Sequence, residues 1–163
     1  MKILINFGLG AYYNMKFENF TSKAQLFFET LPNDWQETII PFWEELKQTT
    51  QVYVLVEDHV IVAGGLIFSK CPPDMMYYEN EAKKWFQKGY LYLGFIYVDE
   101  TKRNRNLGSL WLDNVKKEYP KNGFWLAIED ENLDKFYVRN GFKKVATVKN
   151  VELSEESIYA FNR

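Results

Sequence analysis

The feature that most constrains the fold is a strand, a polar turn and a helix that follow one another within residues 90–118. Residues 90–98 are aromatic and β-branched with one glycine, which predicts a strand. From residue 107 onward apolar side chains recur every three or four positions, which predicts a helix with one buried face. That face consists of Leu107, Leu110, Trp111, Val115 and Tyr119. A chain built around this unit is expected to combine helices with a sheet.

A basic turn lies between this strand and this helix. The first N–H groups of a helix have no intrahelical acceptor, and the helix dipole favours negative charge there. Lys102, Arg103 and Arg105 add three cations within four residues, which suits phosphate groups. Cations on a solvated turn give the same pattern, so the residues alone leave the function of the turn open. Its sequence is Arg103-Asn104-Arg105-Asn106-Leu107-Gly108-Ser109.

The composition limits the classes of protein to which this chain can belong. The 163 residues are 47% hydrophobic and 18% aromatic, enough for a sizeable core, and we expect a single domain over residues 1–163. A net charge of −2 argues against nucleic acid as the main partner. No apolar run reaches the roughly 20 residues that a membrane helix needs. Cys71 is the one cysteine, so an internal disulfide is impossible, and we expect a cytoplasmic protein.

Helical periodicity predicts two helices in the first third of the chain. The first covers residues 17–31. Asn33 or Asp34 can cap a second helix that runs to about residue 48, and Pro41 predicts a kink or break within it.

A β-hairpin is predicted next, from residues 51–57 and 60–69, with Asp58 and His59 at its turn. A lone histidine beside a turn is far more often exposed than catalytic. Gly64-Gly65 in the second strand indicates a bulge or the close approach of another group. The remaining expected elements are a strand at 1–7, a loop at 8–10, a helix at 75–87, a strand at 123–128, a helix from Glu129-Asp130 to Gly141, and strands at 142–148 and 151–161.

The basic turn and its flanks resemble the acyl-CoA-binding segment of the GNAT acyltransferase superfamily. That family has Gln/Arg-x-x-Gly-x-Gly/Ala between its fourth strand and the next helix. Arg103 takes the first position and Gly108 the last, and Asn106 stands where Gly is usual but tolerates a positive φ. The resemblance implies that the turn holds the pyrophosphate of coenzyme A and that the strand end pairs with the pantetheine arm. The implied cofactor residues are Ile96, Tyr97, Val98, Arg103, Asn104, Arg105, Asn106, Leu107, Gly108 and Ser109.

A second segment, FYVRNGFKKV at residues 136–145, resembles the Phe-Tyr-x-x-x-Gly-Phe run of the same family. The resemblance implies that Tyr137 protonates the leaving thiolate of coenzyme A, because an ordinary tyrosine with a pKa of about 10 keeps its proton at neutral pH. The family often places a cofactor-binding Asn ahead of this helix. Asp130 occupies that position here and Asn132 lies two places later, so either residue is a candidate.

The sequence indicates the residues that contact the acceptor amine less clearly. In the family, helices near the start of the chain line the acceptor groove, which implies a contact for Trp35. We expect residues 70–89 to cover the acceptor pocket, with Tyr78 and Glu79 contacting the substrate, together with Tyr92 on the central strand. The general base stays open between Glu79, Glu81 and a water chain through Tyr92 or backbone carbonyls.

These observations predict an α/β protein with the GNAT acyl-CoA N-acyltransferase fold, a mixed and mostly antiparallel twisted sheet flanked by helices. The implied activity is acetyl-CoA-dependent N-acetyl transfer without a metal, by direct attack of an acceptor amine on the thioester. The acceptor would be a small-molecule or peptide amine, no nucleic acid or membrane partner is expected, and a homodimer is possible. The alternative is a GNAT-like domain that binds acyl-CoA without turnover and acts as a sensor or interaction module. Transfer of a longer acyl group is a third reading.

Overall fold

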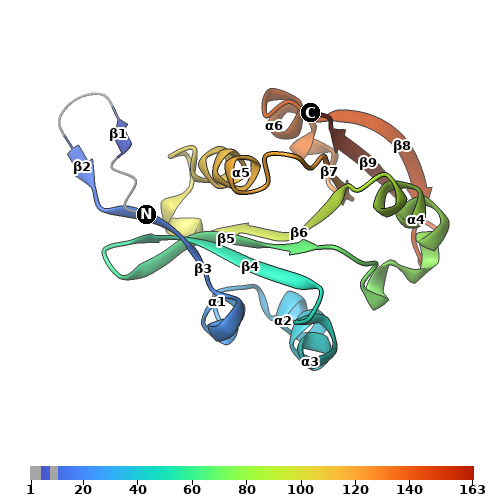
Figure 1. Cartoon of the computed structure of the whole chain (residues 1–163), viewed down its shortest axis with the longest axis horizontal. Coiled ribbons are helices and arrows are strands. Elements are labelled where there is room, and N and C mark those ends of the chain that lie inside the picture. Colours follow the sequence, from blue (N-terminus) through green and yellow to red (C-terminus); the bar gives the residue numbers. More distant parts are fainter. Residues whose placement is uncertain (1–4, 8–10) are drawn as a thin grey trace. The chain divides into compact units, whose positions relative to one another are not determined.

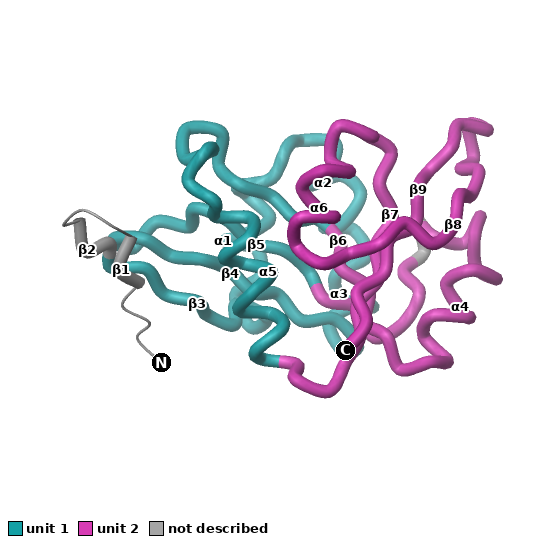
Figure 2. The backbone as a smooth tube through the Cα atoms, turned by 90° about the horizontal axis from the view of Figure 1, so that it is seen from above, with its two compact units in different colours: residues 1–66, 95–118 teal, residues 67–94, 119–163 magenta. Residues whose placement is uncertain are grey.

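The computed structural model describes residues 5–7 and 11–163, so residues 1–4 of the first expected strand and the expected loop at 8–10 lie outside the described residues. Two compact units make up the chain (Figure 2). The first unit comprises Met1–Leu66 and Phe95–Glu118, and the second comprises Ile67–Gly94 and Tyr119–Arg163. None of the helices within the described residues is long and apolar enough to cross a bilayer.

The main sheet has the strand order β3-β4-β5-β6-β7-β9-β8, and β1 pairs with β2 in a separate ribbon (Figure 1). Pairing is antiparallel between β3 and β4, β7 and β9, and β8 and β9, whereas β6 and β7 run parallel. The predicted mixed, mostly antiparallel sheet with flanking helices is therefore confirmed. The strands are β1 Ile5–Phe7, β2 Ala11–Tyr13, β3 Met15–Asn19, β4 Thr50–Glu57, β5 Val60–Phe68, β6 Leu91–Val98, β7 Phe124–Ile128, β8 Lys143–Lys149 and β9 Glu155–Phe161. The α-helices are α1 Gln25–Phe28, α2 Asn33–Ile39, α3 Trp43–Leu46, α4 Glu79–Gln87, α5 Leu107–Glu118 and α6 Asp134–Arg139.

The predicted hairpin is present as β4 and β5. Asp58 and His59 both have positive φ, 48° and 68°, as a tight turn between twisted strands requires. His59 is exposed, as expected for a residue at a turn. The hairpin provides the central strands on which the helices of the first unit pack.

Two consecutive glycines in β5 let helices approach both faces of the first unit. A Cβ on Gly64 would lie 2.5 Å from the Phe27 ring of α1, and a Cβ on Gly65 would lie 2.7 Å from the Trp111 ring of α5. Neighbouring strand residues face opposite sides, so α1 and α5 cover opposite faces of β5, as Figure 1 shows. The indole of Trp111 also donates a 2.9 Å hydrogen bond to the carbonyl of Tyr53. The expected close approach at these glycines is confirmed.

The helix predicted at residues 17–31 is wrong in its first half. Residues 15–19 instead form β3, which pairs with β4 so that Phe17 lies opposite Leu55. The Asn19 side chain then accepts a 2.9 Å bond from the Thr21 N–H, a local turn that ends the strand. Only the four residues of α1 are α-helical in the predicted range. Sheet pairing has overridden a helical apolar period here.

The second predicted helix is broken at Pro41, as expected. It consists of α2, a 3₁₀ turn Ile40–Phe42 and α3. The capping expectation is wrong, because Pro32 occupies the N-cap position and no side-chain cap bond forms there.

In the second unit, α4 and α6 cover opposite faces of β7 and β9. Trp125 lies opposite Ala160, and Leu126 lies opposite Tyr159, on the other face. Phe86 of α4 contacts Trp125 at a centroid distance of 5.5 Å, whereas Tyr137 of α6 contacts Tyr159 at 6.1 Å.

The helix expected from Glu129-Asp130 begins later than predicted. Asp130 caps a 3₁₀ turn, Glu131–Leu133, by accepting a 3.0 Å bond from the Asn132 N–H, and α6 starts at Asp134. The predicted glycine end of α6 is confirmed. Gly141 has a φ of +86°, and the Phe142 N–H donates a 3.0 Å bond to the Tyr137 carbonyl.

Candidate functional site

In the first unit, the turn between β6 and α5 is fixed at both ends. At its start, the Asp99 carboxylate accepts bonds from the N–H and hydroxyl of Thr101, at 2.8 and 2.6 Å. These bonds stabilise the charged form and hold the pKa of Asp99 below its ordinary value. At its end, Leu107 and Gly108 are buried, and the N–H of Leu110 donates the first helical bond, 2.9 Å, to Asn106.

The backbone of this turn has two left-handed residues, Asn104 with φ 63° and Asn106 with φ 57°. The positive φ expected at Asn106 is thus observed, and asparagine tolerates it better than most residues. The N–H groups of Leu107, Gly108 and Ser109 precede the first helical bond, so helix geometry leaves them without an intrahelical acceptor. These groups are backbone donors at the positive end of a helix, which suits a phosphate group.

The cations of the turn have different partners. Arg105 forms two hydrogen bonds to the Glu57 carboxylate at the end of β4, 2.6 and 2.9 Å long. Glu57 is 7% exposed, and the guanidinium of Arg105 holds its pKa below the ordinary value. Lys102 lies 3.9 Å from the same carboxylate. Arg103 is exposed and lies 3.7 Å from Glu100, so Arg103 is readily available to an anionic ligand.

The end of β6 that belongs to the first unit carries a strained residue. Phe95 has a φ of 52°, which is unusual for a bulky side chain and is characteristic of functional sites. Trp35 of α2 packs edge-on against Phe95 and Tyr97, with centroid distances of 5.8 and 6.3 Å. Ile96 instead lies beside Gly65, on the face that α5 covers. Tyr97 and Val98 are half-buried.

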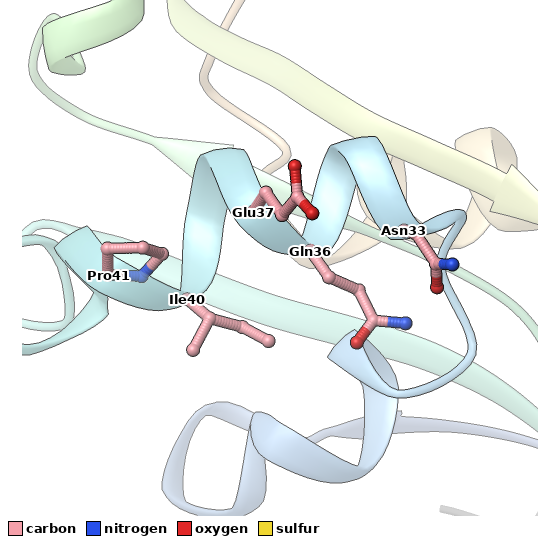
Figure 3. Close-up of a pocket in the computed structure, with 5 residues that line it drawn as sticks. All are labelled: Asn33, Gln36, Glu37, Ile40 and Pro41. Atoms are coloured by element: carbon pink, nitrogen blue, oxygen red, sulfur yellow. The ribbon is translucent and has the colours of Figure 1, made fainter.

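An open depression of about 350 Å³ lies on the other flank of α2 (Figure 3). Helical periodicity places its lining residues roughly opposite Trp35 and Ile39. It therefore does not include Trp35, the predicted acceptor contact of this helix. The lining residues are Asn33, Gln36, Glu37, Ile40 and Pro41.

In the second unit, Tyr137 sits in an aromatic cluster and is 6% exposed. Its ring contacts Phe136, Phe142 and Tyr159 at centroid distances of 5.0, 5.7 and 6.1 Å. Burial raises the pKa of Tyr137 above that of an ordinary tyrosine. This raised pKa keeps the hydroxyl protonated at physiological pH, and among the described side chains none hydrogen-bonds it.

The residues near the start of α6 are arranged around Asp134. The Tyr159 hydroxyl donates a hydrogen bond to the Asp134 carboxylate, and burial together with this partner raises the pKa of Tyr159 to about 12. Asp130 and Asn132, the two candidates for the cofactor-binding position, are both exposed.

The predicted acceptor residues of the second unit fall into two groups. Tyr78 and Tyr92 are buried and close enough for Tyr92 to raise the pKa of Tyr78, although burial is the main cause. Glu79 instead pairs with Lys83 at 2.8 Å, and Glu81 accepts a 2.9 Å bond from the Trp85 indole. Both glutamates suggested as the general base thus interact with other side chains of α4.

Three residues of potential importance escaped the sequence analysis. Glu57 pairs with a residue 48 positions away, and its only local signal is an acid that ends an apolar strand. The positive φ of Phe95 could not be predicted from the sequence. Glycine is the residue expected in that conformation, so a prediction would have chosen the neighbouring Gly94 instead. Glu156 is buried within β9 and accepts a 2.8 Å hydrogen bond from Tyr77. A glutamate among the apolar residues of a strand was its only signal.

Comparisons with known proteins agree on the fold. A GNAT-family protein from Desulfovibrio desulfuricans superimposes with a TM-score of 0.68 at 14% identity, covering 91% of this chain and 98% of that one. A GNAT acetyltransferase from Elizabethkingia anophelis with acetyl-CoA bound gives 0.63 at 11% identity, covering 92% and 99%. FeeM, an N-acyl amino acid synthase from uncultured soil microbes, gives 0.61 at 15%, covering 91% of each chain.

At these identities the likenesses show the fold alone. No curated protein matches the sequence. The model of the acetyltransferase (GNAT) family, however, matches residues 17–142, which is most of the chain. The chain therefore belongs to the acetyltransferase (GNAT) family.

Proposed function

We propose that this protein is an acetyl-CoA-dependent N-acetyltransferase that acts on a small-molecule or peptide amine. The observation that carries the proposal is the turn of residues 103–109, with its two left-handed asparagines and with N–H groups at the start of α5 that have no intrahelical acceptor. Within a member of the GNAT family, this turn would bind the pyrophosphate. Arg103 and Lys102 would add positive charge, and Ile96, Tyr97 and Val98 would contact the pantetheine arm.

In the proposed reaction, the neutral amine nitrogen attacks the thioester carbonyl carbon and forms the C–N bond. The C–S bond then breaks, and the amide and the thiolate of coenzyme A separate. The amine loses one proton in the process, and the thiolate gains one. Catalysis would rest on positioning of the two substrates and on a backbone N–H of β6 that polarises the carbonyl.

Tyr137 is proposed as the donor to the leaving thiolate. Its raised pKa supports this role, because the hydroxyl stays protonated at every pH at which the amine is a nucleophile. A phenol this weak as an acid stabilises the thiolate through a hydrogen bond, and net protonation at the sulfur is completed as a solvent proton returns to Tyr137. Asn132 or Asp130 would contact the cofactor ahead of α6.

The proposal is tested by thiol release from acetyl-CoA with a panel of amines, followed by mass spectrometry of the acetylated product. Diamines, aminoglycosides, amino acids and peptides with free N-termini cover the main acceptor classes. Amine-dependent thiol release with a matching gain of one acetyl group supports the proposal. Cofactor binding without thiol release for any amine would instead support a non-catalytic acyl-CoA-binding domain.

The same assay compares acyl donors. FeeM, which shares the fold, is an N-acyl amino acid synthase, so longer acyl chains belong in the panel. We expect acetyl-CoA to be preferred. Faster turnover with a long-chain acyl-CoA would replace the acetyl group in the proposal with a longer one.

A further inference from the structure

The short helix α6 carries Tyr137, the proposed proton donor, and it packs on β9 of the same unit. Its six residues are too few to hold a helix in place without tertiary contacts. Residue 134 lies about one turn before residue 137, so the side chains of Asp134 and Tyr137 lie on the same face of the helix. That face meets Tyr159 of β9, which is 2% exposed.

Tyr159 contacts both residues on this face of α6. Its hydroxyl donates a hydrogen bond to the carboxylate of Asp134, and its ring centroid lies 6.1 Å from that of Tyr137. The sheet fixes Tyr159 in turn, because its backbone lies opposite Leu126 on one side and Lys144 on the other. A single buried tyrosine of the sheet thus holds the first turn of the helix and also contacts the side chain one turn later.

The two ends of α6 are held in different ways. At the C-terminal end, the Phe142 N–H donates a 3.0 Å bond to the Tyr137 carbonyl. At the N-terminal end, Leu133 occupies the N-cap position, and within the described residues no side chain caps the helix there. The bond from Tyr159 to Asp134 therefore fastens the end that lacks a cap. Without this bond, the first turn is free to shift, and the Tyr137 side chain shifts with it.

The bond between Tyr159 and Asp134 persists over the pH range in which amines react. Burial, and then the hydrogen bond to Asp134, raises the pKa of Tyr159 to about 12. The Tyr159 hydroxyl therefore keeps its proton, and remains a donor, at neutral and moderately alkaline pH.

We propose that Asp134 and Tyr159 are positioning residues for acyl transfer, and that their hydrogen bond holds Tyr137 where its hydroxyl can reach the leaving sulfur. The inference rests on the proposed role of Tyr137 in N-acetyl transfer. Asp134 and Tyr159 act through Tyr137 rather than on the reacting atoms. Such an effect on geometry is large enough to measure, because a displacement of about 1 Å can slow an enzymatic step by about 10²-fold.

The test measures kcat and the KM for acetyl-CoA by thiol release with the best amine of the panel. Tyr159→Phe removes the hydroxyl and keeps the buried ring, so we expect it to fold, to lose about 10-fold in kcat and to keep its KM within about twofold. Asp134→Ala should show the same loss. Asp134→Asn keeps a carbonyl oxygen that accepts the bond, so its kcat should return to within about threefold of wild type.

A double variant separates the positioning of Tyr137 from a general effect on the fold. If the bond acts through Tyr137, Tyr159→Phe should not lower kcat further once Tyr137→Phe has removed the donor. A general loss of structure would instead lower kcat by the same factor in both backgrounds. Tyr90→Phe is the matched control, because its lost hydroxyl donates to Asn162, in the same unit but outside α6. Its kcat should stay within about twofold of wild type.

The outcomes separate the positioning role from the activity itself. If Tyr137→Phe is slow but Tyr159→Phe keeps the wild-type kcat, the positioning role is refuted and the proposed activity stands. An equal loss from Tyr159→Phe with and without the Tyr137 hydroxyl would refute it in the same way. If the wild type releases no thiol with any amine, the proposed activity is refuted, and the positioning role with it.

Discussion

Replacing Glu57 with glutamine should destabilise the first unit through the turn that Arg105 belongs to. Glu57 is 7% exposed and accepts both Arg105 bonds, at 2.6 and 2.9 Å. Breaking a fully buried ion pair costs roughly 3–5 kcal/mol. The Arg105 side chain is 29% exposed and can regain water, and glutamine keeps one acceptor, so we expect a loss of about 2 kcal/mol.

The pH dependence of this loss has a definite sign. Arg105 holds the pKa of Glu57 below its ordinary value, so the extra stability is present above about pH 4.3 and is lost as the pH falls through the lowered folded-state pKa. The difference between wild type and Glu57→Gln should therefore be constant from pH 6 to 8 and should narrow below about pH 4.

Urea unfolding followed by circular dichroism at several pH values measures this difference. Glu44→Gln is the control, since the Glu44 side chain in α3 is 80% exposed and its ion pair is with Lys47, which directly follows that helix. That control should change the free energy of unfolding by less than about 0.5 kcal/mol. A similarly small effect of Glu57→Gln at pH 7, or a difference that grows as the pH falls, would refute the reasoning.

Three further variants test packing, the turn and the chemistry. Gly65→Ala places a methyl 2.7 Å from the Trp111 ring and should lower the free energy of unfolding by about 1–3 kcal/mol in urea, with a change in tryptophan fluorescence. Asn106→Val forces a β-branched residue to a φ of 57° and should weaken acetyl-CoA binding in calorimetry, whereas Asn106→Gly should bind as the wild type does. Tyr137→Phe should lower kcat by about 10²-fold in the thiol-release assay and leave the KM for acetyl-CoA within about twofold, since it removes only the hydroxyl.

The sequence predicted well those elements whose signals are local. The β4–β5 hairpin, β6, the turn and α5 follow from apolar periodicity and turn residues within short windows. The break at Pro41 and the left-handed Gly141 follow from the conformational limits of single residues. Such features could be predicted because the physics that decides them acts within a few residues.

The features that the sequence could not predict depend on contacts between residues that are far apart in the chain. Phe17 fits a helical stripe, but its backbone pairs with Leu55 in β4, and no local signal indicates that partner. Arg105 reads as a cation for the cofactor, yet it is held by Glu57 from another strand. The burial of Glu156 could not be predicted either, because its hydrogen-bond partner Tyr77 is 79 residues away.

The central claim is that residues 103–109 at the start of α5 bind the pyrophosphate of acetyl-CoA, and calorimetric titration tests it most directly. The wild type and Arg103→Ala should be titrated with acetyl-CoA at two salt concentrations. We predict one site per chain in the wild type, weaker binding in Arg103→Ala, and a smaller salt dependence in that variant because one phosphate contact is lost. No binding by the wild type, or identical affinity and salt dependence in both proteins, would contradict the account.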